Sequence, residues 1–234
     1  MTESKPFDLL VVGEINPDLI LRGDVEPAFG QVEKMVDDAT LTIGSSSVIF
    51  ACGAARLGLR VAFAGIVGDD TFGQYMCEQM AARGIDTSAV RVDPGLRTGF
   101  SVILSRGADR AILTFAGSIA ALRYDMLDLR MLDRARHLHL GAFFMLDALR
   151  PDVPRLLGEA RVRGLTTSLD TNYDPSGRWD GGLRNTLRLT DVFLPNEAEL
   201  HAIAGTTDTD AALARLAGPK QTVAAKLGAQ GGVA

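Results

Sequence analysis

The sequence predicts an α/β protein in which a doubly wound, mostly parallel sheet is covered by helices on both faces and carries a small β-flap. Short apolar runs alternate with segments of helical periodicity along most of the chain, which is typical of this class. The composition agrees, because 234 residues with 47% hydrophobic and 23% charged side chains can bury a large core. Two stretches with a different pattern predict the flap.

The strands expected in the main sheet are short apolar runs bounded by turn-forming residues. They lie at 7–13, 61–68, 137–143, 164–170, 191–196 and 222–228. The expected helices lie at 46–58, 71–83, 124–132, 150–163, 181–189 and 196–204. This alternation predicts parallel strand pairing, and in such sheets ligands bind at the carboxyl ends of the strands.

The flap is predicted from two stretches that interrupt the strand-helix alternation. After the first strand comes "INPDLILRGDVEP", in which apolar and polar residues alternate, and "TGFSVILSRGADRAILTFAG" is typical of a hairpin that turns at 107–109. We expect one-sided antiparallel strands that form a small β-flap from roughly 14–43 and 97–116 and project from the edge of the main sheet. The alternative is that they are edge strands of one mixed sheet.

The charge balance, the N-terminus and the cysteines limit the partners and the compartment. The formal net charge is −5 and the basic residues are dispersed, which argues against a nucleic-acid partner because phosphate binding requires a basic face. The first apolar run is too short for a signal-peptide core and no later run has the length of a membrane span. We therefore expect no membrane association and a cytoplasmic protein. Cys52 and Cys77 fall in helix-like segments, where free thiols are expected rather than a disulfide.

Two common nucleotide-binding motifs are missing from the sequence. A dinucleotide fold requires a G-x-G-x-x-G turn between its first strand and a helix, whereas "VVGEINPDLI" offers one glycine and then a proline. No G-x-x-x-x-G-K-[ST] occurs either. The sequence therefore disfavours an NAD-type dehydrogenase and a P-loop protein.

Asn16 and Asp18 stand two residues apart where the flap begins. In an extended chain this spacing puts both side chains on one face. A carboxylate beside an amide suits a bidentate grip on the vicinal hydroxyls of a polyol. An Asn-Pro-Asp turn whose side chains bond to the local backbone explains the pattern equally well.

A second polar group precedes the helix expected at 46–58. Gly44 and Ser45 are followed by two more serines, so hydroxyls and free amides meet at a positive helix terminus that suits an oxygen-rich ligand. An ordinary serine N-cap is the alternative. Farther on, "GIVGDDTFG" delivers Asp70 to the end of a strand, where it is expected to cap the helix beginning near Thr71.

Taken together, these segments resemble the ribokinase-like, pfkB-type carbohydrate kinases. The resemblance runs from Leu9 to the last residue. It rests on "VVGEINPDLIL", "ARLGLRVAFAGIVGDDTFGQYMCEQMAARGIDTSAV", "LDTNYDPSGRW", "DVFLPNEAEL" and "AAKLGAQGG". Each motif alone is weak, but the combination is specific. It implies a doubly wound domain over 1–234 with the flap as a lid, and transfer of the γ-phosphoryl group of ATP to a hydroxymethyl group of a sugar or nucleoside.

The resemblance also assigns residues that bind the sugar or nucleoside. Asp18, with Asn16 beside it, matches the lid carboxylate that binds substrate hydroxyls. Gly44 and Ser45 fall where the family has a substrate-facing glycine pair, and Asn172 lies in the matching "LDTNYDP" segment. A homodimer formed through the lid is left open.

On the nucleotide side, Asn196 and Glu199 match the N-x-x-E motif of the family. The resemblance implies that Asn196 contacts the phosphates and that Glu199 orders a hydrated Mg²⁺, with a monovalent cation left open as a further requirement. Lys226 and Gly228 fall in the strand and turn that border the nucleotide. Without the family, "PNEAEL" is a helix N-terminus whose glutamates favour the helix dipole.

Two departures from the family pattern concern the substrate. Gly44-Ser45 replaces the glycine pair, and Ile49 stands where many members carry a sugar-binding asparagine. Asp174 stands where relatives often have an arginine, which removes a cation and favours a neutral sugar or nucleoside over an acidic one.

A third departure concerns catalysis. In this family a G-A-G-D turn opens a helix after the "KLGAEG"-like strand, and it supplies both the anion hole and the general base. The sequence contains no G-x-G-D, so no catalytic residue is assigned. We expect a truncated product, a fragment or a frameshifted sequence of an active kinase. The alternative is an inactive protein that binds a sugar or nucleoside without phosphoryl transfer.

Overall fold

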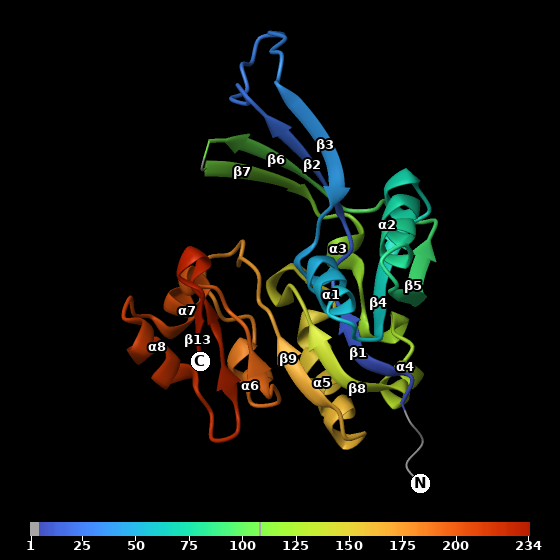
Figure 1. Cartoon of the computed structure of the whole chain (residues 1–234), viewed down its shortest axis with the longest axis vertical. Coiled ribbons are helices and arrows are strands. Elements are labelled where there is room, and N and C mark those ends of the chain that lie inside the picture. The colour runs from blue at the N-terminus through green and yellow to red at the C-terminus, as the bar shows by residue number, and fades with distance from the viewer. Residues whose placement is uncertain (1–4, 108) are drawn as a thin grey trace.

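The structure is a computed structural model that describes residues 5–107 and 109–234. Its main sheet has seven strands in the order β11-β10-β9-β8-β1-β4-β5 (Figure 1). These are β1 (Phe7–Val12), β4 (Val61–Gly68), β5 (Asp86–Asp93), β8 (Ala135–Leu140), β9 (Thr166–Leu169), β10 (Val192–Phe193) and β11 (Thr222–Val223). Every neighbouring pair is parallel, which confirms the predicted sheet.

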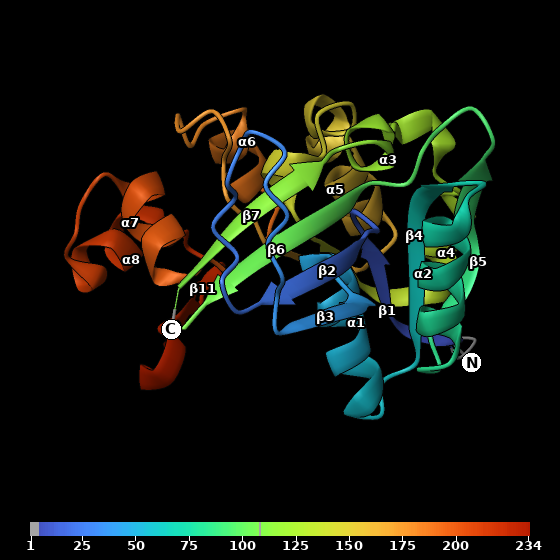
Figure 2. The same ribbon diagram turned by 90° about the horizontal axis from the view of Figure 1, so that it is seen from above.

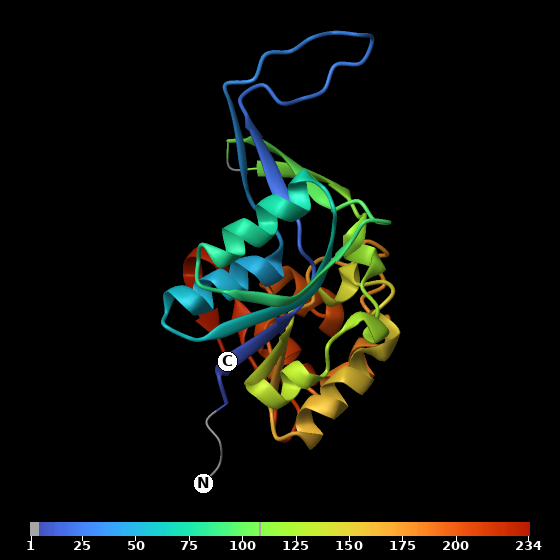
Figure 3. The same ribbon diagram turned by 90° about the vertical axis from the view of Figure 1, so that its right-hand side faces the viewer.

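Helices cover both faces of this sheet. Successive residues of its strands point to opposite sides, and both sides carry apolar side chains that must be buried. Leu9 and Val11 of β1 pack with α1 (Ser46–Arg56) and α2 (Thr71–Ala81), whereas Leu10 and Val12 belong to the core on the opposite face. That second core includes side chains of α4 (Arg130–Arg134), α5 (Val153–Val162), α6 (Leu183–Leu187), α7 (Glu197–Ala204) and α8 (Thr209–Leu216). Figure 3 shows α1 and α2 on one side of the sheet and α4 and α5 on the other.

The flap is a separate four-stranded sheet in the order β3-β2-β6-β7, and we refer to it as the lid. Its strands are β2 (Pro17–Arg22), β3 (Asp38–Ile43), β6 (Phe100–Arg106) and β7 (Asp109–Phe115), and the short helix α3 (Ser118–Ala121) follows them. The lid stands over one edge of the main sheet in Figure 1, and Figure 2 shows it from above. The alternative of a single mixed sheet is therefore wrong.

The strand directions in the lid differ from the prediction at one pair. The pairs β2-β3 and β6-β7 are antiparallel, but β2 pairs with β6 in parallel. The reason is that β2 follows β1 and β6 follows β5, and these two parallel strands of the main sheet end at the same edge. Ala108, in the middle of the predicted hairpin turn, lies outside the described residues, as does the polar start of the chain at 1–4.

Two predicted elements form differently from the expectation. The helix expected at 124–132 is a 3₁₀ turn at Tyr124–Met126 followed by α4, because Leu127 takes an extended conformation between them. The strand expected at 222–228 is divided into β11 and β12 (Ala225–Lys226), and β12 pairs antiparallel with β13 (Gly232–Val233) outside the main sheet. No helix in the described parts of the chain is both long and apolar enough to cross a membrane.

Asp70 links the main sheet to the lid. Its carboxylate accepts a hydrogen bond from the backbone N–H of Gly73 at 2.9 Å, which confirms the predicted cap of α2. It also accepts one from the N–H of Thr98 at 2.7 Å, just before β6 begins. These bonds hold the pKa of Asp70 below its ordinary value despite partial burial, so the cap carries its charge at neutral pH.

Candidate functional site

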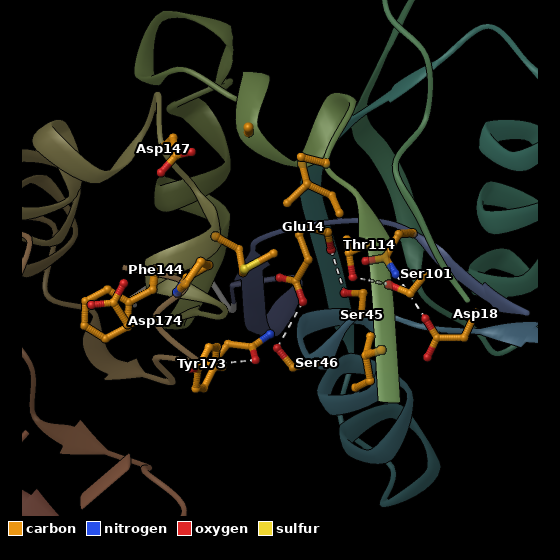
Figure 4. A pocket seen from close by; sticks show the side chains of 18 of the residues that line it. Glu14, Asp18, Ser45, Ser46, Ser101, Thr114, Phe144, Asp147, Tyr173 and Asp174 are labelled. Carbon is orange, nitrogen blue, oxygen red and sulfur yellow. Dashed lines mark hydrogen bonds between the residues drawn. The ribbon is translucent and has the colours of Figure 1, made fainter. Parts of the chain in front are cut away.

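A pocket lies between the carboxyl ends of the main-sheet strands and the lid (Figure 4). Its volume is about 1020 Å³, at the upper end of the range typical of small-molecule sites. The walls come from the segment after β1, the N-terminus of α1, the lid strands β2, β6 and β7, and the segments after β8 and β9. This is the edge at which open α/β sheets bind ligands.

Asn16 and Asp18 lie side by side on the wall of the pocket, where the chain passes from β1 into the lid. Nδ2 of Asn16 donates a hydrogen bond to Oδ1 of Asp18 at 3.2 Å, so the side chains share one face as predicted. The same Nδ2 lies 3.3 Å from the carbonyl oxygen of Pro17, so the alternative local bond is also present. Burial raises the pKa of Asp18, and nearby Arg110 opposes this shift. These two bonds use both N–H groups of the Asn16 amide, so the pair presents acceptor oxygens to the pocket.

Gly44 allows this pair to approach the main sheet closely. Its N–H donates to the carbonyl oxygen of Asn16 at 3.0 Å, which ties the entry of the lid to its exit. A Cβ atom built on Gly44 would overlap Oδ1 of Asp18 and lie 2.9 Å from Nδ2 of Asn16. A side chain at this position is therefore incompatible with the observed Asn16-Asp18 pair.

Ser45 lines the pocket and also caps α1, so the N-cap that the sequence left as an alternative is confirmed. Its Oγ accepts from the N–H of Val48 at 3.0 Å and donates to the carbonyl oxygen of Glu14 at 2.7 Å. The residue has a φ of 68°, in the left-handed region that non-glycine residues rarely adopt. Such a conformation at the wall of a pocket is typical of functional sites.

Glu14 is a pocket residue that the sequence analysis did not single out. It lies after β1, is 4% exposed, and accepts hydrogen bonds from Ser46 and Ser47 at the N-terminus of α1. Burial raises the pKa of its carboxyl, although the bonds from the two serines act in the opposite direction. The available signal was the spacing of Glu14, Asn16 and Asp18, which places three polar side chains on one side of an extended segment.

Asn172 lines the pocket from the segment that follows β9. It has a φ of 56°, and its N–H donates to Oδ1 of Asp170 at 3.0 Å. Its own side-chain oxygen accepts from the N–H of Tyr173 at 2.7 Å, which leaves the amide nitrogen for other partners. The structure thus brings Asn172 to the same pocket as Asn16, Asp18 and Ser45.

Asn196 and Glu199 form a second polar cluster with residues after β9. They make a complete capping box at the start of α7, in which each side chain bonds to the backbone N–H of the other at 2.9 Å. Nδ2 of Asn196 also donates to Oε1 of Glu199 at 2.7 Å, and Thr171 Oγ1 lies 3.4 Å from Oε2. Burial raises the pKa of Glu199, the nearby Asp170 carboxylate adds to this, and Lys226 opposes it.

Lys226 joins this cluster through an ion pair. Its Nζ lies 2.6 Å from Oδ2 of Asp170, and its backbone bridges to Asn196 in parallel register. Gly228 lies two residues farther on, where a 3₁₀ turn begins, and has a φ of 58°. The structure therefore brings Asn196, Glu199 and Lys226 together and places Gly228 in the turn beyond them.

Three consecutive residues connect the pocket with the second cluster. Asp170 and Thr171 contact Lys226 and Glu199, and Asn172 lines the pocket. The N–H of Asp170 donates to the carbonyl oxygen of Leu140 at 2.9 Å, which fixes this segment against the end of β8. The two predicted groups of residues thus lie at adjacent positions along the same edge of the sheet.

Asp174, which stands where relatives often have an arginine, lines the pocket but is held by local hydrogen bonds. It is 4% exposed, and its carboxylate accepts from Ser176 Oγ at 2.9 Å and from the N–H of Trp179 at 2.6 Å, so it organises a local turn. The pocket is nevertheless lined by Arg110, Arg150 and Arg178. The loss of a cation at position 174 therefore leaves other cations in the pocket, and the argument for a neutral substrate no longer holds.

Comparisons with known proteins identify the family of the chain. The family described as pfkB family carbohydrate kinase matches residues 7–234. A 5-dehydro-2-deoxygluconokinase of Geobacillus thermodenitrificans is 30% identical over 180 residues, covering 74% of this chain and 51% of the relative. A probable fructokinase-7 of Arabidopsis thaliana is 28% identical, covering 70% of this chain and 51% of the relative. The chain thus spans about half the length of these curated relatives.

Solved structures give the same result at the level of the fold. The crystal structure of a PfkB protein from Polaromonas sp. JS666 matches with a TM-score of 0.81 and 26% identity, over 97% of this chain and 78% of that one. A putative ribokinase II from E. coli in complex with ATP and Mg²⁺ also matches with a TM-score of 0.81, at 23% identity, over 97% of this chain and 74% of the other. The family match covers nearly the whole chain, and the chain belongs to the pfkB family of carbohydrate kinases.

Proposed function

We propose that the pocket binds a sugar or nucleoside and that the protein acts in ATP-dependent phosphorylation of a hydroxymethyl group on that ligand. The observation that carries this proposal is the Asp170-Thr171-Asn172 segment. It joins a pocket with paired amide and carboxylate groups to a cluster formed by Asn196, Glu199 and Lys226. A kinase requires the acceptor and the nucleotide phosphates to be neighbours in this way, because phosphoryl transfer depends mainly on positioning and electrostatics.

The second cluster fits a nucleotide and a hydrated Mg²⁺. Within the described residues the Glu199 carboxylate accepts hydrogen bonds from Asn196 and Thr171, so it is suited to bind the water ligands of a metal rather than the metal itself. Mg²⁺ commonly retains several waters in kinase sites. Within 5–107 and 109–234 no cluster of three or more His, Cys, Asp or Glu side chains forms a metal cage. When bound, Mg²⁺ neutralises phosphate charge, and a monovalent cation is a further candidate cofactor.

The chain's own residues have separate tasks in this proposal. Asn16 and Asp18 bind substrate hydroxyls from the lid side, and the lid excludes water from the pocket. Asn196 and Lys226 approach the phosphates, with Lys226 exchanging its ion pair with Asp170 for a phosphate oxygen. The sequence holds no G-x-G-D turn, so no general base or anion hole is assigned to these residues. A sugar-binding protein without phosphoryl transfer is the alternative function. A cytoplasmic location, where ATP is supplied, accompanies the proposal.

Calorimetry and a coupled ATP assay test this proposal. We expect one of D-fructose, 5-dehydro-2-deoxy-D-gluconate and adenosine to bind, and Asp18→Asn to weaken this binding about tenfold or more, because a charged hydrogen-bond acceptor is lost. The matched control is Asp210→Asn, at an exposed position of α8. We expect turnover of Mg-ATP to stay at background. Failure of all three ligands to bind contradicts a sugar or nucleoside pocket, and clear phosphorylation by the chain contradicts the expectation that these residues lack a general base.

We further propose that two copies associate through the outer face of the lid. Leu41, Leu19, Val102 and Leu113 are register partners across all four lid strands, so their side chains form one apolar row. The row lies on the face opposite the pocket, which is lined by the alternate residues of β2, β6 and β7. Leu41 is 42% exposed and Leu113 is 60% exposed, and an apolar sheet face of this kind is typical of a protein interface.

A further inference from the structure

Glu14 is a buried carboxylate of the pocket, with 4% of its surface exposed. It comes from the same extended segment as Asn16 and Asp18, and it lies nearest to the main sheet, whereas Asp18 belongs to the lid. Its side chain is directed toward Ser46 in Figure 4. A buried carboxylate without a basic partner is unfavourable unless its surroundings provide hydrogen bonds.

The position of Glu14 is built by residues of three elements. A Cβ atom on either Gly13 or Gly141 would overlap the Ser47 side chain, so two glycines at the ends of β1 and β8 make room for this serine. Ser47 Oγ donates to Oε2 of Glu14, and the N–H of Ser47 donates to Oε1 at 3.3 Å. Ser46 Oγ donates to Oε1 at 3.0 Å. Glu14 is therefore held in a fixed orientation by the first turn of α1.

These bonds leave part of the carboxylate available to a ligand. A carboxylate accepts about four hydrogen bonds, two at each oxygen. Oε1 of Glu14 takes two, and Oε2 takes one, from Ser47. Among the residues that the structure describes, none donates a hydrogen bond to the second position of Oε2, although Glu14 lines the pocket. A hydroxyl group in the pocket is the simplest donor for it.

Anchoring of α1 is the simpler explanation of Glu14, because an anion at a helix N-terminus stabilises the helix. That role accounts for the bonds to Ser46 and Ser47 but does not require the carboxylate to line a pocket of about 1020 Å³. It also does not require a carboxylate, since Ser45 already caps the helix. The remaining acceptor position and the pocket together favour a role in binding.

We propose that Glu14 is a substrate-binding residue that accepts a hydrogen bond from a sugar hydroxyl at the end of the pocket nearest the main sheet, and thereby excludes anionic groups from that end. This inference rests on the proposed function. Glu14 also orients the ligand in this proposal. Its negative charge repels a carboxylate or phosphate on the sugar, so this group is directed toward the arginines of the pocket. These arginines are Arg110, Arg150 and Arg178.

The test compares Glu14→Gln with Glu78→Gln, a matched control at an exposed position of α2. Calorimetry with D-fructose and its monodeoxy analogues measures the dissociation constant of each variant. We expect Glu14→Gln to bind fructose about tenfold more weakly, because a neutral acceptor replaces a charged one. Removal of the hydroxyl that bonds to Glu14 should weaken binding, relative to fructose, in the unaltered chain. For this deoxy analogue the loss should be about tenfold smaller in Glu14→Gln, because the partner of the missing hydroxyl is already altered.

The dependence of binding on pH separates this role from anchoring. Because burial raises the pKa of Glu14 above its ordinary value, the carboxyl becomes charged only above the usual carboxyl range, and the unaltered chain is expected to bind fructose more tightly as the pH rises through that higher range. Asp18 has a raised pKa as well and contributes to this slope, so Glu14→Gln should retain only part of it. The other charged groups that line the pocket are Asp147, Asp174, Arg110, Arg150 and Arg178.

Three outcomes distinguish failure of this inference from failure of the proposed function. If fructose binds and Glu14→Gln changes neither the affinity nor the effect of any deoxy analogue, the inference is wrong while the proposed function stands. If neither fructose nor the other test ligands bind the unaltered chain, the proposed function and this inference both fail. Should Glu14→Gln not fold, the pH profile of Asp18→Asn replaces it. Burial raises the pKa of Glu14, so its contribution lies above the ordinary carboxyl range, and a profile that is flat there contradicts the inference.

Discussion

At the scale of single residues, a substitution of Gly44 tests the geometry of the pocket most directly. We expect Gly44→Ala to weaken sugar binding at least tenfold, because the new methyl group overlaps Oδ1 of Asp18 and must displace it. Gly53→Ala is the control, because Gly53 lies within α1 and a Cβ there meets no atom within 4 Å. Alanine should stabilise the helix at Gly53 by about 0.5–1 kcal/mol. Calorimetry and urea denaturation measure both effects, and equal sugar affinity in the two variants would contradict the assigned geometry.

The residues of the site were predicted to different degrees, for reasons that follow from their spacing. Asn16 and Asp18 could be paired from the sequence because a two-residue period fixes their relative direction. The Asp170-Lys226 ion pair joins residues 56 positions apart, and no local pattern reports such a contact. Glu14 was missed because its bonds come from Ser46 and Ser47, which reach it only when α1 packs at the end of β1.

At the scale of elements, the N-terminus of α7 is predicted to bind Mg-ATP as well as to stabilise the helix. Asn196→Ala should destabilise the protein by about 1 kcal/mol through loss of the capping box. The variant should also bind Mg-ATP more weakly, because Asn196 is proposed to contact the phosphates. Asp208→Ala removes the corresponding cap of α8, where Asp208 accepts from Ala211 at 2.7 Å, and provides the control. Equal Mg-ATP affinity in both variants, at similar losses of stability, would leave Asn196 with a capping role alone.

The elements that the sequence predicted well are those with a strong period. β1, β4, α1 and α2 lie close to their expected bounds because buried strands and capped helices carry clear patterns. The edge strand β5 was missed because only one of its sides is covered, so "DTSAVRVD" lacks a continuous apolar run. The parallel pairing of β2 with β6 depends on the direction in which two distant segments enter the lid, which a local pattern does not contain.

At the scale of the whole molecule, the apolar row of the lid predicts self-association. Light scattering after gel filtration should show dimers that dissociate on dilution, and Leu113→Lys should shift the chain to monomers, because a charge is placed in the row. Leu57→Lys is the control, since Leu57 is 86% exposed but lies at the end of α1, away from the lid. A monomer at all concentrations, or dimers that persist in Leu113→Lys, would show that this face is not the interface.

The connection between the lid and the main sheet has a consequence for motion. The chain enters the lid past Glu14 and Asn16 and leaves it past Gly44 and Ser45, and two hydrogen bonds tie these crossings together. A swing of the lid would carry Asp18 with it while Glu14 stays with the main sheet. This connection, one of the two places where the chain joins the lid to the main sheet, therefore shares its residues with the wall of the pocket. A substitution that loosens this connection is therefore expected to change sugar binding as well. The mobility of the lid and the specificity of the pocket are coupled in this protein.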